Sequence, residues 1–206
     1  MTKLASLGIA RLEGIHYYVR DLERSRRFYT EKLDFAESWR STPELEQAGG
    51  QRSACYTAGN VMVLCSTPLG PLGPLGQARG RAARFLAKHP DGVGALVFEV
   101  EDAARTFALI EERGGTPIED IATFQDDGGT LRHFSITTPF GDCTFRFRER
   151  RGYRSLFPGT VPAPRPEGGG GTNRFGFEQI DHVTSNFQTM KPMLLWLEHV
   201  MGFEQM

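Results

Sequence analysis

The chain has 206 residues, enough for one or two compact domains with hydrophobic cores of their own. Its 24 Lys and Arg residues balance 25 Asp and Glu residues, which argues against a surface field that would attract nucleic acid or an anionic membrane. Residues 1–14 lack the apolar core of a signal peptide, and no run approaches the roughly 18 apolar residues of a membrane span. The three cysteines are odd in number and lie among apolar residues, which indicates reduced thiols and predicts a cytoplasmic location.

The first 70 residues predict a strand, a helix and three further strands. Asp21 is a suitable helix N-cap between a strand at residues 15–19 and a segment whose apolar residues recur at helical spacing. Gly59-Asn60 supplies a two-residue turn between the last two strands. The three strands after the helix are expected at residues 35–39, 52–57 and 61–66. This order of elements is a βαβββ module.

A second βαβββ module follows a loop at residues 68–80, which repeats Pro-Leu-Gly three times, and a short helix at residues 81–88. Asp102 is the expected N-cap of the helix in this second module. The predicted elements are a strand at 95–100, a helix at 103–113, and strands at 117–123, 131–137 and 143–147. Arg146 and Arg148 on the last strand are expected to face solvent. The chain thus contains an internal repeat of about 80 residues, typical of paired modules.

Residues 157–176 are rich in Pro and Gly and predict a linker that does not pack a core. The pattern then starts a third time, with a strand at 179–184 and a helix at 191–201, before the sequence ends. We therefore predict two modules in residues 1–156, the linker, and the start of a truncated domain in residues 177–206. The tail after Phe157 is expected to dock loosely or to be disordered.

Paired βαβββ modules are the plan of the vicinal oxygen chelate, or glyoxalase-like, fold, which is an α+β architecture. Three stretches resemble the 4-hydroxyphenylpyruvate dioxygenases in particular. They are residues 89–102, residues 140–159 with the proline-rich linker after them, and Ile180-Asp181-His182-Val183 followed by Asn186. The resemblance covers nearly the whole chain.

The resemblance implies four modules in two domains, of which only the C-terminal domain holds Fe(II). The ligands implied are two histidines and a glutamate, a set typical of non-haem iron oxygenases. His182 matches the first histidine, and the resemblance places the other two ligands in a fourth module that this sequence does not contain. The full-length enzyme would convert 4-hydroxyphenylpyruvate and O2 to homogentisate and CO2 in tyrosine catabolism. No catalytic or cofactor-binding residue other than this metal ligand is assigned, and the chain alone is predicted to be inactive.

The first two modules are expected to be a metal-free scaffold. His182 precedes Asn186 by four residues, and the same count back from Asp21 and Asp102 gives Tyr17 and Phe98. The corresponding fourth-strand positions fall near Val63 and Phe145. Tyrosine is an uncommon ligand and the other three side chains bind no metal. The remaining histidines are interpreted as structural: His16, His89, His133 and His199.

Asp181 precedes His182 and is interpreted as a structural group or a partner of the ligand, not a ligand itself. Two alternatives stay open. One is hydroxymandelate synthase, which resembles the same family and uses the same substrate and iron. The other is a non-catalytic vicinal-oxygen-chelate binding module. Expected partners are a small 2-oxo acid and O2, with neither nucleic acid nor membrane, and a homo-oligomer is compatible with the sequence.

Overall fold

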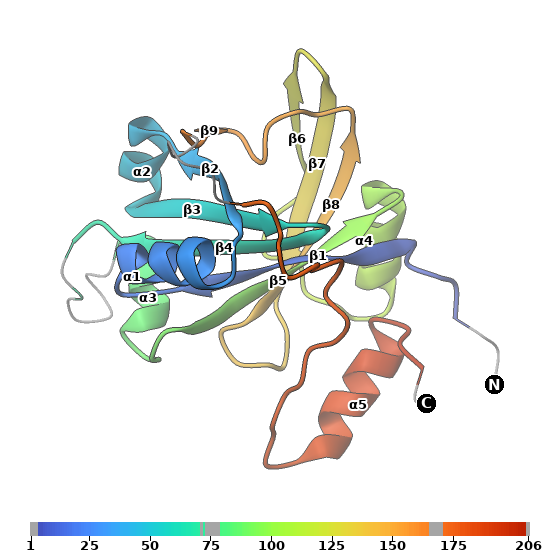
Figure 1. The fold of residues 1–206 in the computed structure, drawn as a ribbon. Helices are drawn as coiled ribbons and strands as arrows, with labels where there is room; N and C mark the ends of the chain where they lie inside the picture. Colours follow the sequence, from blue (N-terminus) through green and yellow to red (C-terminus); the bar gives the residue numbers. More distant parts are fainter. Residues whose placement is uncertain (1–3, 71, 73–78, 165–170, 205–206) are drawn as a thin grey trace. The chain divides into compact units, whose positions relative to one another are not determined.

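The computed structural model describes residues 4–70, 72, 79–164 and 171–204, and these form two compact units (Figure 1). Unit 1 comprises Met1–Leu12, Leu96–Arg154 and Asp181–Met206, and unit 2 comprises Glu13–Ala95 and Ser155–Ile180. Strands β1 (Ile9–Tyr18) and β5 (Gly92–Val100) each contribute residues to both units. Part of the predicted linker, Pro166 and Gly168 to Gly170, lies outside the described residues, as does most of the Pro-Leu-Gly loop.

Unit 2 contains the first βαβββ module, which confirms the predicted order of elements. Its strands lie in the order β5-β1-β4-β3-β2-β9, and β1 runs parallel to β4 while β4, β3, β2 and β9 are successively antiparallel. The elements after β1 are α1 (Leu22–Arg27), the π-helix η1 (Phe28–Lys32), β2 (Ala36–Ser41), α2 (Pro43–Gly49), β3 (Gln51–Ala58), β4 (Val61–Pro68), α3 (Arg81–Leu86) and β9 (Thr160–Pro162). Asp21 caps α1 as predicted, because its carboxylate accepts a hydrogen bond from Arg24 N at 2.9 Å.

Unit 1 contains the second module, with strand order β6-β7-β8-β5-β1. After β5 come α4 (Ala103–Glu112), β6 (Ala122–Asp126), β7 (Gly129–Ile136), β8 (Thr144–Arg151) and α5 (Met190–His199). Asp102 caps α4 through Arg105 N at 3.0 Å, and the buried Glu149 carboxylate accepts a second hydrogen bond from Ala103 N at 2.9 Å. The first turn of α4 is therefore fixed to strand β8.

Three sequence expectations about strands are wrong. The strand predicted at 117–123 begins only at Ala122, and Pro117 forms a single isolated bridge to Ile136. Continuing the register in which Ala122 opposes His133 would place Pro117 opposite Thr138, but Pro117 bridges Ile136, so the pairing is interrupted between Pro117 and Ala122. Residues 179–184 form no strand, since this stretch pairs with no other strand among the described residues.

The third error concerns Arg148, which was expected to face solvent but is only 4% exposed. Strand β8 lies between β7 and β5, so both of its edges are paired, and the burial of residues of both parities shows that both of its faces are covered. Phe145 and Phe147 are buried on one face, and Arg148, of opposite parity, on the other. Alternation along a strand predicts which residues share a face, but it does not tell whether the second face is open.

The tail after Phe157 is also more ordered than expected. Strand β9 adds to the edge of β2, pairing Val161 with Arg40, so the predicted linker contributes a strand to unit 2. In unit 1, α5 packs on the hydrophobic cluster of α4, β7 and β8, where Val200 and Met201 are 4% and 2% exposed. The expectation of loose docking is therefore wrong for both segments, because each buries apolar or backbone polar groups that would otherwise face water.

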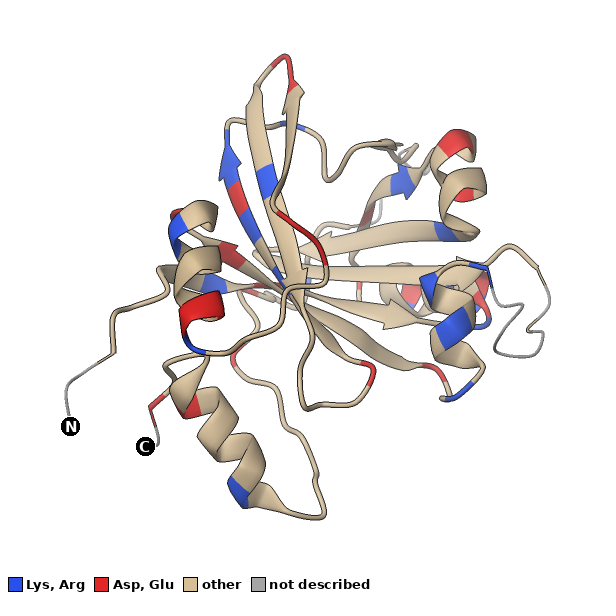
Figure 2. Ribbon diagram, turned by 180° about the vertical axis from the view of Figure 1, so that it is seen from behind, with Lys and Arg blue, Asp and Glu red and all other residues tan. Residues whose placement is uncertain are grey.

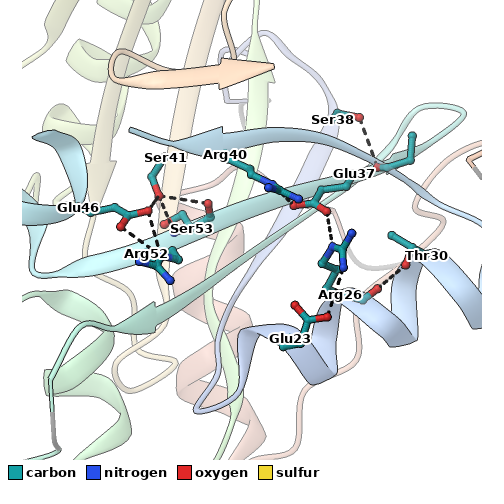
Figure 3. Close-up of polar contacts among 11 residues, drawn as sticks. Glu23, Arg26, Thr30, Glu37, Ser38, Arg40, Ser41, Glu46, Arg52 and Ser53 are labelled. Atoms are coloured by element: carbon teal, nitrogen blue, oxygen red, sulfur yellow. Dashed lines mark hydrogen bonds and ion pairs between the residues drawn. The ribbon is translucent and has the colours of Figure 1, made fainter. Parts of the chain in front are cut away.

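A buried carboxylate joins α1 to β2 in unit 2 (Figure 3). Glu37, whose side chain is 5% exposed, accepts hydrogen bonds from Arg26 Nε at 2.7 Å and Arg40 Nε at 2.5 Å. Burial alone would raise the pKa of Glu37, but the hydrogen bonds from the two guanidinium groups outweigh it and hold the pKa below its ordinary value. The carboxylate is therefore ionised at neutral pH and cross-links the helix to the strand.

We predict that Glu37→Gln lowers the free energy of unfolding by about 1–2 kcal/mol at pH 7, because two charge-assisted hydrogen bonds are lost while both arginines remain half-exposed. A lowered carboxyl pKa gives stability that is complete above the unfolded-state pKa and is lost as the pH falls through the folded-state pKa. The difference should therefore shrink below about pH 4.5. Urea unfolding from pH 7 to pH 3 measures it, with exposed Glu31→Gln as the control. A difference independent of pH would contradict this role.

We also predict that Trp196→Ala destabilises unit 1 by about 2–3 kcal/mol, while Leu195→Ala changes stability by less than about 1 kcal/mol. The Trp196 ring packs against Phe145 and Phe140, with ring centroids 5.8 and 6.0 Å away, whereas Leu195 is 42% exposed. Hydrogen exchange of the α5 amides, together with urea unfolding, distinguishes the two variants. Equal effects would show that α5 is not docked through its Trp196 face.

Candidate metal centre

The four positions considered as ligand equivalents in the first two modules all lie in apolar clusters. Tyr17 and Val63 pack in the core of unit 2, and Phe98 and Phe145 pack in the core of unit 1. The Phe98 ring lies edge-on to Phe145 at 5.1 Å, so each side chain fills space between sheet and helix. The side chains at these positions pack the cores. Of the four, only Tyr17 has a polar atom, its hydroxyl, that could bind a metal. Burial, followed by the proximity of Cys65, raises the pKa of Tyr17, which disfavours the phenolate that a metal would need.

The remaining histidines of the two modules have structural surroundings. His16 is 2% exposed and its Nε2 lies 2.7 Å from the Ser66 hydroxyl. His133 stacks on Phe124 at 6.0 Å, and burial, followed by the charges of Arg148 and Arg146, lowers its pKa to about 4. His133 is thus neutral at physiological pH. It lies beside arginines that would repel a cation.

Two of the three cysteines, Cys55 and Cys65, are not placed as nucleophiles or ligands. Cys55 and Cys65 are buried, and burial raises the pKa of the Cys65 thiol to about 12. A protonated, inaccessible thiol neither attacks a substrate nor binds a metal. Across the described part of the chain, no group of three or more His, Cys, Asp and Glu side chains gathers as a metal site would require.

His182 is more exposed than the histidines of the two modules. Its side chain is 73% exposed, in an irregular segment that precedes α5. Its Nδ1 lies 2.7 Å from the Asp181 carboxylate, which is an acceptor and so makes Nδ1 the donor. In a neutral imidazole this leaves the lone pair on Nε2, the arrangement that metal-binding histidines commonly have. The predicted ligand and its carboxylate neighbour are therefore paired, although not on the strand that the sequence indicated.

The sequence interpretation assigned no role to Asp34. It lies two residues after η1 and has a left-handed backbone with φ 55°. Its carboxylate accepts hydrogen bonds from Gly171 N, Thr172 Oγ1 and Arg174 N. Asp adopts this conformation more readily than most residues, but these partners lie about 140 residues away in the sequence and are invisible to local patterns.

The charges of the described chain show no segregation that would mark a polyanion site. Basic and acidic residues are interspersed along the helices and strands of each unit (Figure 2). In addition, none of the helices in the described residues is both long and apolar enough to span a bilayer. A surface cavity of about 560 Å³ in unit 2, bordered by Gln47, Leu69 and Arg79, contains no metal-binding side chain.

Comparison with known proteins identifies the class of this chain. Residues 8–142 match the family model described as Glyoxalase/Bleomycin resistance protein/Dioxygenase superfamily. The chain therefore belongs to this superfamily, and the predicted glyoxalase-like fold of paired βαβββ modules is confirmed.

Its relatives include several 4-hydroxyphenylpyruvate dioxygenases. The enzyme of Coccidioides posadasii is 25% identical over 216 residues, covering 94% of this chain and 50% of the relative. That of Caenorhabditis elegans is 32% identical over 124 residues, covering 58% of this chain and 31% of the relative. The chain thus spans half or less of the length of these relatives.

Solved structures agree on the fold. A 4-hydroxymandelate synthase variant from Streptomyces coelicolor superposes with a TM-score of 0.69 at 18% identity, covering 95% of this chain and 53% of that one. Methylmalonyl-CoA epimerase from Mycobacterium tuberculosis superposes with a TM-score of 0.55 at 17% identity, covering 72% of this chain and 93% of that one. At these identities the likeness concerns architecture alone.

We predict that Asp181→Asn shifts the neutral His182 ring from the Nδ1-protonated tautomer toward the Nε2-protonated one, because the acceptor for Nδ1–H is weakened. Nitrogen-15 chemical shifts of the labelled imidazole report the tautomer directly. Glu178→Gln, which removes an exposed carboxylate four positions earlier in the sequence, serves as the control and should leave the ring unchanged. An unchanged tautomer in Asp181→Asn would show that Asp181 does not orient His182.

Proposed function

We propose that this chain is part of a 4-hydroxyphenylpyruvate dioxygenase, a non-haem Fe(II) enzyme that forms homogentisate and CO2 from 4-hydroxyphenylpyruvate and O2. The main support is the similarity to a relative of that name, which is 25% identical and covers 94% of this chain. That stretch includes His182, whose Nδ1 is paired with a carboxylate as in many metal sites.

The residues present fit only part of an iron site. His182 would supply one neutral imidazole through Nε2, and Asp181 would fix its tautomer. One imidazole does not hold Fe(II) in a stable geometry, so further donors must come from outside the described residues. When bound, the iron would bind the 2-oxo acid and activate O2. No step of the reaction is assigned to residues of the first two modules, and the chain alone is predicted to be inactive.

The first two modules have a structural role in this proposal. Their would-be ligand positions are occupied by Tyr17, Val63, Phe98 and Phe145, which pack the cores beneath the helices. A scaffold of this kind supports the second half of the enzyme without competing for its metal. The predicted boundaries, residues 1–156 for the scaffold, 157–176 for the linker and 177–206 for the start of the iron-binding domain, are part of this proposal.

Two alternatives make different predictions. A hydroxymandelate synthase would use the same substrate and iron but yield 4-hydroxymandelate, and the fold of such an enzyme matches 95% of this chain. A non-catalytic binding module would bind no iron, in keeping with the apolar side chains at the ligand-equivalent positions. The proposal also includes a cytoplasmic location and a small-molecule 2-oxo acid as partner, with neither nucleic acid nor membrane.

We predict that His182→Ala in the full-length gene product lowers bound Fe(II) at least tenfold and abolishes oxygen uptake that depends on 4-hydroxyphenylpyruvate, because one of few metal donors is lost. Iron analysis and an oxygen electrode measure the two effects, and chromatography distinguishes homogentisate from hydroxymandelate. His199→Ala, at the end of α5, is the matched control and should retain both properties. Full iron content in His182→Ala would refute the proposed ligand.

A further inference from the structure

Strand β9 forms the edge of the sheet in unit 2, where it covers the outermost strand of the first module (Figure 1). It pairs antiparallel with β2. The pairing continues beyond β9, because Thr42 N donates to Gly159 O and Ala163 N donates to Ser38 O, both at 2.9 Å. Without this cover, the backbone groups of β2 would form an open edge to which another strand could add.

These two hydrogen bonds define which backbone groups point toward β2. In an antiparallel pair, the hydrogen-bonding groups of a strand face its partner at every second residue. Gly159 and Ala163 bond to β2, so the odd-numbered residues of this stretch face it. The even-numbered residues Thr160, Pro162 and Pro164 therefore direct their backbone groups away from β2, toward the place that a further strand would occupy.

The three outward-facing residues offer no available backbone donor in the described stretch 160–164. The Thr160 N–H donates to Phe157 O at 3.1 Å, and the Thr160 hydroxyl donates to the same oxygen at 2.6 Å. Pro162 and Pro164 have no N–H group. A strand that approached this side would find acceptors but no donors, so it could not form the reciprocal hydrogen bonds of a β-ladder.

The outer side of β9 lies at the surface of unit 2. Val161 is 46% exposed, and Pro162 and Pro164 are exposed as well. An exposed edge with both donors and acceptors is a template for pairing with another chain, and short edge strands that contain proline prevent such pairing. The position of the two prolines thus matters for association and not only for local conformation.

We infer that residues 157–164 form a terminating cap of the sheet in unit 2, which covers β2 and keeps a second copy of the chain from adding to this edge. The cap satisfies the backbone of β2 on one side and withholds donors on the other. This role is independent of the proposed function, since it involves neither metal nor substrate. It gives a physical purpose to two prolines of the predicted linker.

The test gives the outer edge the donors that it lacks. The variant Pro162→Thr/Pro164→Thr adds two outward N–H groups at exposed positions, and threonine is favoured in strands. Pro90→Thr is the matched control, because it also replaces an exposed proline by threonine but lies in a bend before β5. Sedimentation of the 206-residue chain over a range of concentrations measures self-association, and hydrogen exchange at the same concentrations shows where it occurs.

The double variant should self-associate at least about tenfold more tightly than Pro90→Thr, because each new backbone hydrogen bond contributes to the pairing of two edges. The amides of residues 162 and 164 should become protected as the concentration rises. Equal self-association of the two variants would overturn the inference, as would tighter association that leaves these amides unprotected.

The single variants Pro162→Thr and Pro164→Thr, each of which adds one donor, keep the test decisive if the double variant does not fold. Each should associate more tightly than Pro90→Thr and show concentration-dependent protection at its new amide. If neither does, the outer edge of β9 does not control association.

Discussion

The burial of one sheet face beneath a helix is the constraint on which both modules depend. Phe134 and Phe147 stack at 4.9 Å, and Phe98 and Phe147 at 5.6 Å, on the side of the sheet that α4 covers. In unit 2, Tyr29 of η1 stacks on Tyr56 of β3 at 5.1 Å, so this helical segment covers the corresponding sheet face. Aromatic pairs of this kind contribute burial and a preferred geometry. Phe98, Phe145, Tyr17 and Val63 belong to the same clusters, so these positions stabilise the fold through packing.

This constraint also explains what the sequence could predict. The two βαβββ modules, both helix N-caps and most strands followed from alternation, helical spacing and turn residues, all of which are local. The sequence also shows directly which side chains, mostly apolar, stand at the four positions equivalent to metal ligands. The burial of Arg148 could not be predicted, because it depends on what covers the second face of β8, which is a property of the complete fold. The late start of β6 depends on a change of register against β7 between Pro117 and Ala122, which a local pattern does not show.

The tail shows the limits of composition as a guide. Pro and Gly content predicted a linker without a core, yet β9 extends the sheet of unit 2 and residues 171–177 are held by Asp34 and Phe35. These contacts join residues at least 119 positions apart, as Ser41 and Thr160 are, so no short window of the sequence contains them. His182 was recognised through its neighbours in the sequence, and the structure adds the pairing with Asp181 and the departure from strand geometry. A local motif thus identified the candidate ligand, whereas the contacts that hold the residues before it are long-range and became visible only in the structure.

The proposed arrangement is a metal-free pair of modules followed by a histidine that contributes to an iron site. Its most direct test is anomalous X-ray scattering at the iron edge from crystals of the full-length gene product loaded with Fe(II). The account predicts one iron peak at a bonding distance of about 2 Å from His182 Nε2 and none among residues 8–154. A peak within the first two modules, or an iron site that excludes His182, would contradict it.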